Sequence, residues 1–354
     1  MKVTYCWTEP SGYLAACVSE LSRRPDVAVS LITWETAAVA PFVGLEAQAV
    51  RSRVLTRAER DDPAVVARAV CETSPDVVVF AGWAHRPYVK LLDEPSLRHA
   101  KFVMNADTPL RFDWRQRLAR LKIGRLLRRV DAIVVPGERG YQLMRSWGVP
   151  AAKVTQRLYC IDYRSFAAAA ASRFTAGRDW PRRFLFVGRY VPIKAVDVLV
   201  EAYARYRDQV AEPWPLTTCG TGPLQGLLTL PGIEDRGFVQ PSDLPGVFLE
   251  AGAFLLPSRS DAWGQAIVEA AAAGLPVVCT QGCGAAETVK DFHNGLVVPV
   301  GDAAALARAM RWLHEHHGLL PDMGRRAQEV AAAFSAECWA DVQVDLCARL
   351  LGRG

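Results

Sequence analysis

Short runs of Val, Ile and Phe alternate along the chain with longer stretches rich in Ala, Leu and Arg. The short runs have the length and composition of buried strands, and the longer stretches repeat apolar positions at helical spacing. Strands that helices connect in this way form parallel sheets. In the first half, the pattern predicts strands at residues 2–7, 27–33, 77–81, 102–105 and 132–135.

The same alternation starts again in the second half of the chain. Here the pattern predicts strands at residues 184–188, 215–219, 253–256, 276–279 and 296–298. Residues 163–181, between the two series, hold a run of alanines and little β pattern, so we place the domain boundary there. A chain of 354 residues has room for two cores of ordinary size. The expected division is a first domain at 1–163, a linker at 164–182 and a second domain at 183–334.

Composition agrees with a chain that folds over its whole length. It is 51% hydrophobic and 22% charged, far from the profile of a disordered protein. No apolar run approaches the roughly 18 residues of a membrane span, and the first residues alternate like a strand instead of forming a secretory leader. Nine scattered cysteines do not indicate a disulfide framework or a metal site. We therefore expect a cytoplasmic protein.

Positive charge concentrates in the first half. Residues 1–163 carry 24 Lys and Arg against 17 Asp and Glu, whereas residues 164–354 carry 18 against 20. The excess lies in a predicted amphipathic helix within residues 111–129, whose basic residues are Arg111, Arg115, Arg117, Arg120, Lys122, Arg125, Arg128 and Arg129. One interpretation is a solvated helix whose leucines face the core. The other is a patch for anionic lipid, at the inner face of a membrane, or for a phosphate-bearing acceptor. Nucleic acid is not expected, because no nucleic-acid-binding motif accompanies the charge.

Candidate chemistry gathers at strand-to-helix junctions of the second half, where parallel sheets bind anionic ligands. The first strand there ends at Gly188, Arg189 follows it, and Lys194 precedes the next helix. Two cations at one turn suit a diphosphate that leaves with growing negative charge. Gly220 and Gly222 follow the next strand and allow a tight turn or close approach of a ligand. Their spacing to the next glycine does not match a dehydrogenase nucleotide loop.

A third junction carries two carboxylates. Asp261 lies on a loop, and Glu269 follows eight positions later inside a helix that begins near Gly264. Such a pair can accept hydrogen bonds from hydroxyl groups of a sugar and a ribose, while the amides of Gly264, Gln265 and Ala266 can face phosphate. The alternative makes Asp261 a helix cap and Glu269 a solvated residue.

Together these elements resemble glycosyltransferase family 4, most strongly over residues 184–300. The likeness rests on the Gly188-Arg189 turn with Lys194, the Gly220 to Pro223 turn, Gly237-Phe238-Val239, the Asp261 to Glu269 spacing, a following Gly-Leu-Pro, Glu287 and Asn294-Gly295. The resemblance implies the α/β GT-B fold, with two Rossmann-like domains facing across a cleft that closes over the substrates. It also implies a closing helix at residues 335–354 that packs back on the first domain.

The resemblance implies roles for these residues as well. Arg189 and Lys194 would hold the donor diphosphate, Glu269 the ribose, Asp261 with the amides of residues 264–266 the transferred sugar, and the loop with Val239 the base. The chain departs from the family twice, because Asp261 stands where Glu is usual and Ala195 where Gly is favoured. The shorter carboxylate puts the identity of the sugar and the strength of this contact in question.

Candidates in the first half are fewer. Gly12 and Tyr13 resemble the family's glycine-bearing loop that faces the donor, and Asn105 and Asp107 follow a strand where many members have a histidine. Asp107 is the candidate for contacting the sugar or acceptor, with a turn anchored by its side chain as the alternative. His85 is another acceptor-side candidate, with a structural histidine as the alternative.

The implied function is a hexosyltransferase that retains anomeric configuration and requires no metal or other cofactor. Its donor would be a nucleotide diphosphate sugar with UDP or GDP, its acceptor a glycan, glycolipid or small metabolite, and its catalytic residues Arg189, Lys194, Asp261 and Asp107. The alternatives are a non-catalytic nucleotide-sugar binding module and another GT-B enzyme, such as a sugar-nucleotide epimerase or a phosphorylase.

Overall fold

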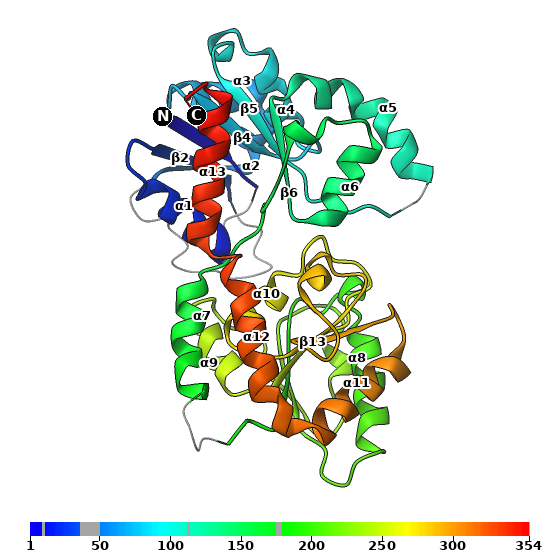
Figure 1. Cartoon of the computed structure of the whole chain (residues 1–354). Coiled ribbons are helices and arrows are strands. Elements are labelled where there is room, and N and C mark those ends of the chain that lie inside the picture. Colours follow the sequence, from blue (N-terminus) through cyan, green and yellow to red (C-terminus); the bar gives the residue numbers. More distant parts are fainter. Residues whose placement is uncertain (9–10, 36–49, 112–113, 175–178, 354) are drawn as a thin grey trace. The chain divides into compact units, whose positions relative to one another are not determined.

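The computed structural model describes residues 1–8, 11–35, 50–111, 114–174 and 179–353. The chain divides into two compact units, one formed by Met1–Cys160 with Ala336–Gly354 and the other by Ile161–Ser335. Each unit contains one parallel sheet with helices packed on it (Figure 1).

The sheet of the first unit has the strand order β3-β2-β1-β4-β5-β6-β7, and all neighbouring strands are parallel. The strands are β1 (Lys2–Cys6), β2 (Ala28–Trp34), β3 (Arg51–Leu55), β4 (Val77–Ala81), β5 (Lys101–Asn105), β6 (Ala132–Val135) and β7 (Val154–Gln156). The helices are α1 (Gly12–Ser22), α2 (Arg57–Asp61), α3 (Pro63–Cys71), α4 (Arg86–Lys90), α5 (Trp114–Arg129), α6 (Glu138–Ser146) and α13 (Ala336–Leu350).

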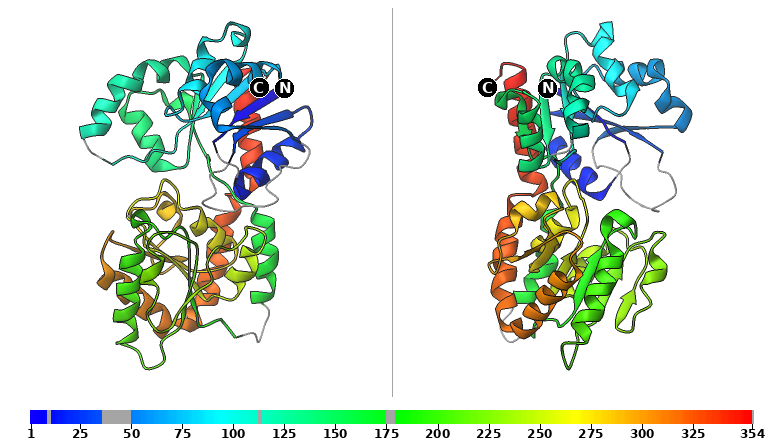
Figure 2. Two further views of the ribbon diagram at one scale, coloured as in Figure 1. Left: turned by 180° about the vertical axis from the view of Figure 1, so that it is seen from behind. Right: turned by 90° about the vertical axis from the view of Figure 1, so that its right-hand side faces the viewer.

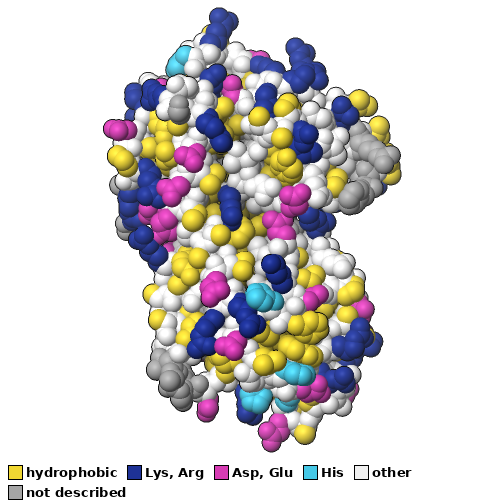
Figure 3. All heavy atoms as spheres, in the orientation of Figure 1, with side chains coloured by type: hydrophobic (Ala, Val, Ile, Leu, Met, Phe, Trp, Pro, Cys, Tyr) yellow, Lys and Arg dark blue, Asp and Glu magenta, His cyan; other side chains and the backbone are white. Residues whose placement is uncertain are grey.

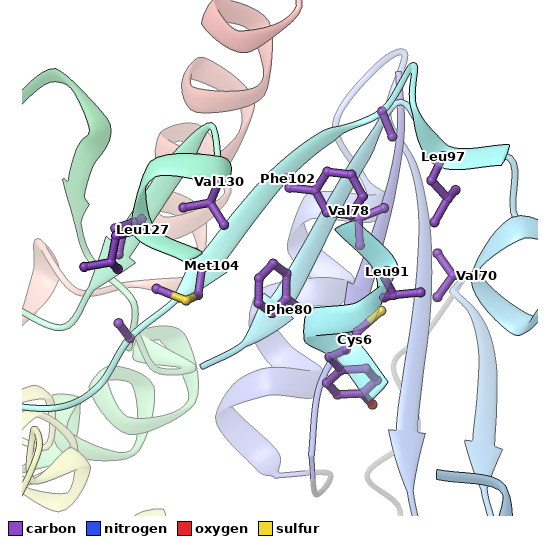
Figure 4. Packing of buried hydrophobic residues seen from close by; sticks show 14 of the residues in the cluster. Cys6, Val70, Val78, Phe80, Leu91, Leu97, Phe102, Met104, Leu127 and Val130 are labelled. Carbon is purple, nitrogen blue, oxygen red and sulfur yellow. The ribbon is translucent and has the colours of Figure 1, made fainter. Parts of the chain in front are cut away.

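Both faces of this sheet are buried. Alternate residues of the central strands, such as Phe80 and Met104, join the cluster shown in Figure 4, to which α3 and α5 contribute Val70 and Leu127. On the other face Tyr5 donates a hydrogen bond to Gln343 of α13 at 3.0 Å, and α13 packs beside α1 (Figure 2, right). A strand that is covered on both faces must be apolar along its whole length, which explains the run Val-Val-Val-Phe-Ala of β4.

The sheet of the second unit has the order β10-β9-β8-β11-β12-β13, again all parallel. Its strands are β8 (Phe184–Val187), β9 (Leu216–Cys219), β10 (Ile233–Asp235), β11 (Ala253–Leu256), β12 (Val277–Thr280) and β13 (Gly295–Val298). Its helices are α7 (Tyr163–Ala170), α8 (Val196–Arg207), α9 (Leu244–Leu249), α10 (Gln265–Ala272), α11 (Ala303–Glu315) and α12 (Leu320–Ala332). Helix α8 packs against α11, whereas α10 packs against α12 and α7.

All ten strands predicted from the pattern are present within one or two residues of their predicted bounds. The sequence pattern missed three strands, β3, β7 and β10, and each lies at an edge of its sheet. An edge strand has one neighbour and needs little apolar surface, as the sequences Arg-Ser-Arg-Val-Leu of β3 and Ile-Glu-Asp of β10 show.

The stretch predicted as a linker at 164–182 is helical in part. Asp162 caps α7 by accepting a hydrogen bond from the Ser165 amide at 3.2 Å, and Phe166 packs edge-on against Phe248. Arg173 is buried and donates hydrogen bonds of 2.7 Å to the carbonyl oxygens of Ala251 and Phe248. Tertiary contacts of this kind, which a local alanine-rich pattern does not reveal, attach these residues to the second unit.

The basic helix predicted within residues 111–129 is present as α5, but the expectation that its leucines face the core is only half right. Leu127 is buried and Leu126 is partly buried against the core cluster, whereas Leu118 and Leu121 are 50% and 79% exposed. Residues 112–113 and the side chain of Arg117 lie outside the described part of the structure. Within the described ranges, no helix is both long enough and apolar enough to cross a bilayer.

Candidate functional site

The three junctions predicted to carry chemistry follow neighbouring strands of the second sheet. β8 pairs with β9 on one side and with β11 on the other, and all three are parallel. Their carboxyl ends therefore meet at one edge of the sheet, which places Gly188, Gly220 and Pro257 at the start of adjacent loops. Parallel sheets bind their ligands outside this edge.

The two glycine turns interlock. A Cβ atom at Gly220 would lie 2.0 Å from the carbonyl oxygen of Gly188, and one at Gly222 would lie 2.4 Å from that of Tyr190. The Tyr190 amide also donates a hydrogen bond to the Thr221 carbonyl at 2.8 Å. Glycine is thus required here because one backbone lies directly against another. The role of Gly188, Gly220 and Gly222 in donor binding stays a prediction.

Asp235, which the sequence pattern did not single out, ties these turns to the end of β10. It accepts hydrogen bonds from the Tyr190 hydroxyl at 2.6 Å, the Gln225 side chain at 2.7 Å and the Gly237 amide at 3.0 Å. Burial opposes ionisation, but these hydrogen bonds, with one from Thr218, lower the pKa of Asp235 below its ordinary value. The loop after Gly237 that carries the partly exposed Val239 is held at its base in this way.

Arg259, also missed, fastens the turn before α8 to the loop after β11. Its guanidinium pairs with both carboxylate oxygens of Asp197 and donates to the Pro192 carbonyl at 2.6 Å. Its backbone amide donates to the Ile193 carbonyl at 2.8 Å. The hydrogen bonds from Arg259 lower the pKa of Asp197. These contacts of Arg259 hold in place the turn that carries Lys194, the residue after Ile193.

Lys194 and Asp261 form an ion pair, and the side chains are only 19% and 14% exposed. The backbone of Asp261 is held independently, since its amide donates to the Gly282 carbonyl at 3.0 Å and its carbonyl accepts from the Gly284 amide at 3.1 Å. Two residues predicted to act at one site are thus in contact, on loops that other residues hold in place.

Ala195, which stands where a glycine would be favoured, has a left-handed backbone with φ of 56°. Its side chain is fully buried. An L-residue with a Cβ atom adopts this conformation at a cost of about 1–2 kcal/mol. The left-handed backbone at Ala195 therefore explains why glycine would be preferred at this position.

Helix α10 begins at the same edge of the sheet. Gly264 precedes it in a left-handed conformation with φ of 89°, and the backbone amides of Gln265 and Ala266 form its first turn. Helix N-termini favour anions through these amides.

Glu269 lies one turn further along α10 and is partly exposed. Among the described residues no hydrogen-bond donor or cation contacts its carboxylate. Burial alone raises the pKa of Glu269 to about 7. A partly ionised carboxylate without a protein partner is a group that a ligand's hydroxyl donors can satisfy.

Arg189 differs from Lys194, because its guanidinium is exposed and has no carboxylate partner within the described ranges. It is therefore available to a ligand at the same turn. The described residues contain no group of three or more His, Cys, Asp and Glu side chains that could hold a metal ion.

In the first unit, Tyr159 contacts two of the predicted residues, Asp107 and Tyr13. Tyr159 donates a hydrogen bond to Asp107 at 3.1 Å and packs edge-on against Tyr13, with ring centroids 5.4 Å apart. Burial is the main cause that raises the pKa of Tyr13 to about 12. Gly12 begins α1 beside Tyr13, and the buried Asn105 ends β5 two residues before Asp107. Tyr159 was not identified from the sequence, since no motif surrounds it.

His85 lies apart from that group, in an aromatic cluster. Its ring centroid is 4.4 Å from those of Trp34 and Tyr88, and Arg60 lies 4.7 Å above the Trp34 ring. Burial lowers the pKa of His85. These contacts favour the structural alternative for His85 over a role toward the acceptor.

Comparison with known structures defines the fold. The chain superposes over 99% of its length on HepE (Alr3699) of Anabaena, described in complex with UDP, with a TM-score of 0.76 and 17% identity, covering all of that chain. Sucrose-phosphate synthase of Thermosynechococcus elongatus gives a TM-score of 0.77 with 18% identity over 99% of this chain and all of that one. The fold is therefore GT-B, built from two Rossmann-like units, as predicted.

The sequence comparisons each match part of the chain. Residues 181–316 match the family model described as glycosyl transferases group 1. D-rhamnosyltransferase WbpZ of Pseudomonas aeruginosa is 30% identical over 227 residues, which are 60% of this chain and 57% of that protein. D-inositol 3-phosphate glycosyltransferase of Salinispora tropica is 34% identical over 193 residues, 47% and 39% of the two chains. The chain thus spans about half the length, or less, of these curated relatives.

Proposed function

We propose that this protein is a retaining glycosyltransferase that moves a hexose-type sugar from a nucleotide diphosphate sugar to an acceptor hydroxyl. The observation that carries the proposal is the meeting of Lys194, Asp261 and the first turn of α10 at the carboxyl edge of the second sheet. The match of residues 181–316 to glycosyl transferases group 1 supports it.

The donor would lie along this edge. Arg189 and Lys194 supply two positive charges for the diphosphate, and the amides of Gln265 and Ala266 supply hydrogen-bond donors. Glu269 would accept hydrogen bonds from the ribose hydroxyls, and the loop with Val239 would contact the base. UDP or GDP is the expected nucleotide, and the binding of UDP described for HepE supports the former.

Asp261 would hold a hydroxyl of the transferred sugar. Its contact with Lys194 places this carboxylate beside the cation assigned to the diphosphate, which suits a bond that breaks between sugar and phosphate. The aspartate side chain is shorter than the usual glutamate, and the ion pair further limits its reach. We therefore expect the donor sugar to lie closer to this loop than it would if the residue were Glu.

In the transfer step the bond between the anomeric carbon and the diphosphate oxygen breaks, and the electron pair leaves with the nucleotide. Arg189, Lys194 and the helix amides stabilise the charge that grows on the diphosphate. An acceptor oxygen forms the new bond from the same face, and its proton passes to an oxygen of the departing diphosphate. Because these groups compensate the charge, we propose that the reaction requires no metal, which activity in the presence of EDTA would test.

The residues assigned to the acceptor side belong to the first unit. Asp107, oriented by its hydrogen bond from Tyr159, is the candidate group for a sugar or acceptor hydroxyl. Gly12, Tyr13 and Asn105 belong to the same proposal, with a glycan, glycolipid or small metabolite as the expected acceptor.

A thermal-shift screen with UDP, GDP, ADP, TDP and their sugar conjugates tests the donor site. A ligand at 100 times its dissociation constant stabilises the folded state by about 2.7 kcal/mol. We expect a shift with one base that Lys194→Ala abolishes and that Arg308→Ala, an exposed arginine on α11, leaves intact. No shift with any nucleotide would overturn the proposal.

Product analysis then separates the alternatives. We expect the product to retain the anomeric configuration of the donor sugar, which nuclear magnetic resonance would measure. Donor binding without transfer to any of a broad set of acceptors would identify a binding module, and conversion of the donor sugar without an acceptor would identify an epimerase.

A further inference from the structure

Helix α5 of the first unit has two apolar faces. Its 16 residues include Trp114, Leu118 and Leu121, which are 66%, 50% and 79% exposed. Residues at these spacings lie on one side of a helix and form a continuous stripe. We call these three residues the outer stripe.

The outer stripe is not needed to attach α5 to its unit. Leu127 is buried, and Ala119, Ile123 and Leu126 pack against the core cluster from the opposite side of the helix. Exposing a tryptophan and two leucines to water is unfavourable by about 25 cal/mol per Å² of apolar surface. The arrangement thus indicates a partner that covers the stripe.

Positive charge borders the outer stripe. The helix contains seven Lys and Arg and no Asp or Glu. Arg115, Lys122, Arg125 and Arg128 are exposed, and none of them has a carboxylate partner in the part of the chain that the structure describes. Arg129 is different, since it pairs with Asp93 at 2.7 Å. Figure 3 shows hydrophobic and basic side chains side by side where α5 lies at the edge of the unit.

We propose that α5 docks this protein on an anionic lipid bilayer, lying along its surface with the outer stripe among the acyl chains and the bordering cations at the headgroups. A helix of 16 residues is about 24 Å long, enough to lie in the interface. Lysine and arginine side chains extend their charged ends toward phosphates while their stems stay in apolar surroundings.

The combination of features selects this partner. A nucleic acid would account for the cations but not for three large exposed apolar side chains in a row. A bilayer accounts for both, because its interface offers negative charge beside an apolar layer. The proposal does not rest on the transferase function, since no residue of α5 belongs to the donor or acceptor groups.

The test is flotation of the full chain with phosphatidylcholine vesicles, with and without one third phosphatidylglycerol. We expect binding only to the anionic vesicles, weakened when salt rises from about 0.1 M to about 1 M, where screening shortens from about 10 Å to about 3 Å. Equal binding to both vesicle types, or none to either, would overturn the proposal.

Two pairs of substitutions separate charge from insertion. Lys122→Gln with Arg125→Gln should weaken binding roughly 25-fold, because each basic residue near the surface contributes about a factor of five. Leu118→Ala with Leu121→Ala should weaken it by about tenfold or more at unchanged charge. Because all four side chains are exposed, circular dichroism and the melting temperature should remain those of the wild type.

Matched controls use exposed residues elsewhere. Leu227→Ala with Leu319→Ala removes two leucines that are 41% and 51% exposed in the second unit, and should not change binding. Arg308→Gln with Arg349→Gln removes two exposed cations outside α5, and should change it little. If the leucine pair of α5 has no effect while its charge pair does, the helix binds polyanions generally, and the bilayer proposal is wrong.

Measuring donor binding for the same variants tests the membrane proposal and the transferase proposal independently. The α5 variants should retain the thermal shift with the nucleotide, whereas Lys194→Ala should retain vesicle binding. Loss of both properties in any one of these variants would indicate misfolding, so vesicle binding is scored only for variants that keep the wild-type melting curve.

Discussion

The ammonium of Lys194 donates a hydrogen bond to Oδ2 of Asp261, joining the loop after β8 to the loop after β11. The pair is largely shielded from solvent, and each partner is held by backbone contacts that do not depend on the other. A cation and a carboxylate so placed can act on neighbouring parts of one ligand, and this relationship is the basis of the predictions for the donor site.

Replacing Lys194 by Ala should lower kcat/KM for transfer by about 100-fold to 1000-fold, the usual effect of removing one preorganised electrostatic contact from a reacting anion. The loss should appear with every acceptor, because the diphosphate is common to all. Steady-state kinetics would measure it, with Arg308→Ala as the matched loss of an exposed cation. A near-normal rate in a folded Lys194 variant would contradict the assigned role.

Glu269 should make both donor binding and stability depend on pH near neutrality. Its pKa is raised to about 7 from an ordinary value of 4.5, so the folded protein holds the proton more tightly than the unfolded chain. The associated stability is fully present below about pH 4.5 and is lost as the pH rises through about 7. Relative to Glu269→Gln, the free energy of unfolding should fall by on the order of 1–3 kcal/mol across this range.

Donor affinity should change in the opposite sense, because the ionised carboxylate accepts hydrogen bonds from ribose hydroxyls more strongly. We expect the dissociation constant of the nucleoside diphosphate to decrease between pH 6 and 8 for the wild type, following the raised pKa of about 7. Isothermal titration at several pH values would show this, and Glu269→Gln should give a flatter profile. An identical slope in both proteins would rule Glu269 out as the ribose contact.

Gly222→Ala should destabilise the second unit by about 2–3 kcal/mol, since overpacking against a backbone carbonyl forces the chain to move. The added Cβ would lie 2.4 Å from the Tyr190 oxygen. Gly226→Ala is the matched control, because a Cβ there meets nothing within 4 Å. Urea denaturation would compare the two. Equal free energies of unfolding would mean that the two turns are not packed as described.

Tyr159→Phe should impair acceptor use while leaving the donor site intact. The variant keeps the ring contact with Tyr13 but loses the hydrogen bond to Asp107, so Asp107 is no longer oriented. We expect a rise in KM for the acceptor or a fall in kcat of about tenfold, with an unchanged thermal shift on donor binding. Asp107→Asn should show the same pattern, and a selective loss of donor binding in either variant would contradict it.

The structure also shows where sequence patterns stop being informative. The central strands were predicted because burial on both faces requires apolar residues throughout, as in β4 and β11. The edge strands β3, β7 and β10 were missed, since exposure leaves them a polar composition. Tyr159, Asp235 and Arg259 were missed because each has a side-chain partner ten or more positions away, and no local motif marks them.

Local apolar periodicity and turn chemistry are enough to predict the two parallel sheets, the order of the junctions and the residue types at each. Three further features depend on how the folded chain packs: Lys194 contacts Asp261, Gly220 and Gly222 lie against another backbone, and Leu118 and Leu121 face solvent. The reason is physical. Apolar spacing along a helix or strand shows that the element has an apolar face. It does not show which surface covers that face or which distant groups become neighbours, because both depend on how the whole chain packs.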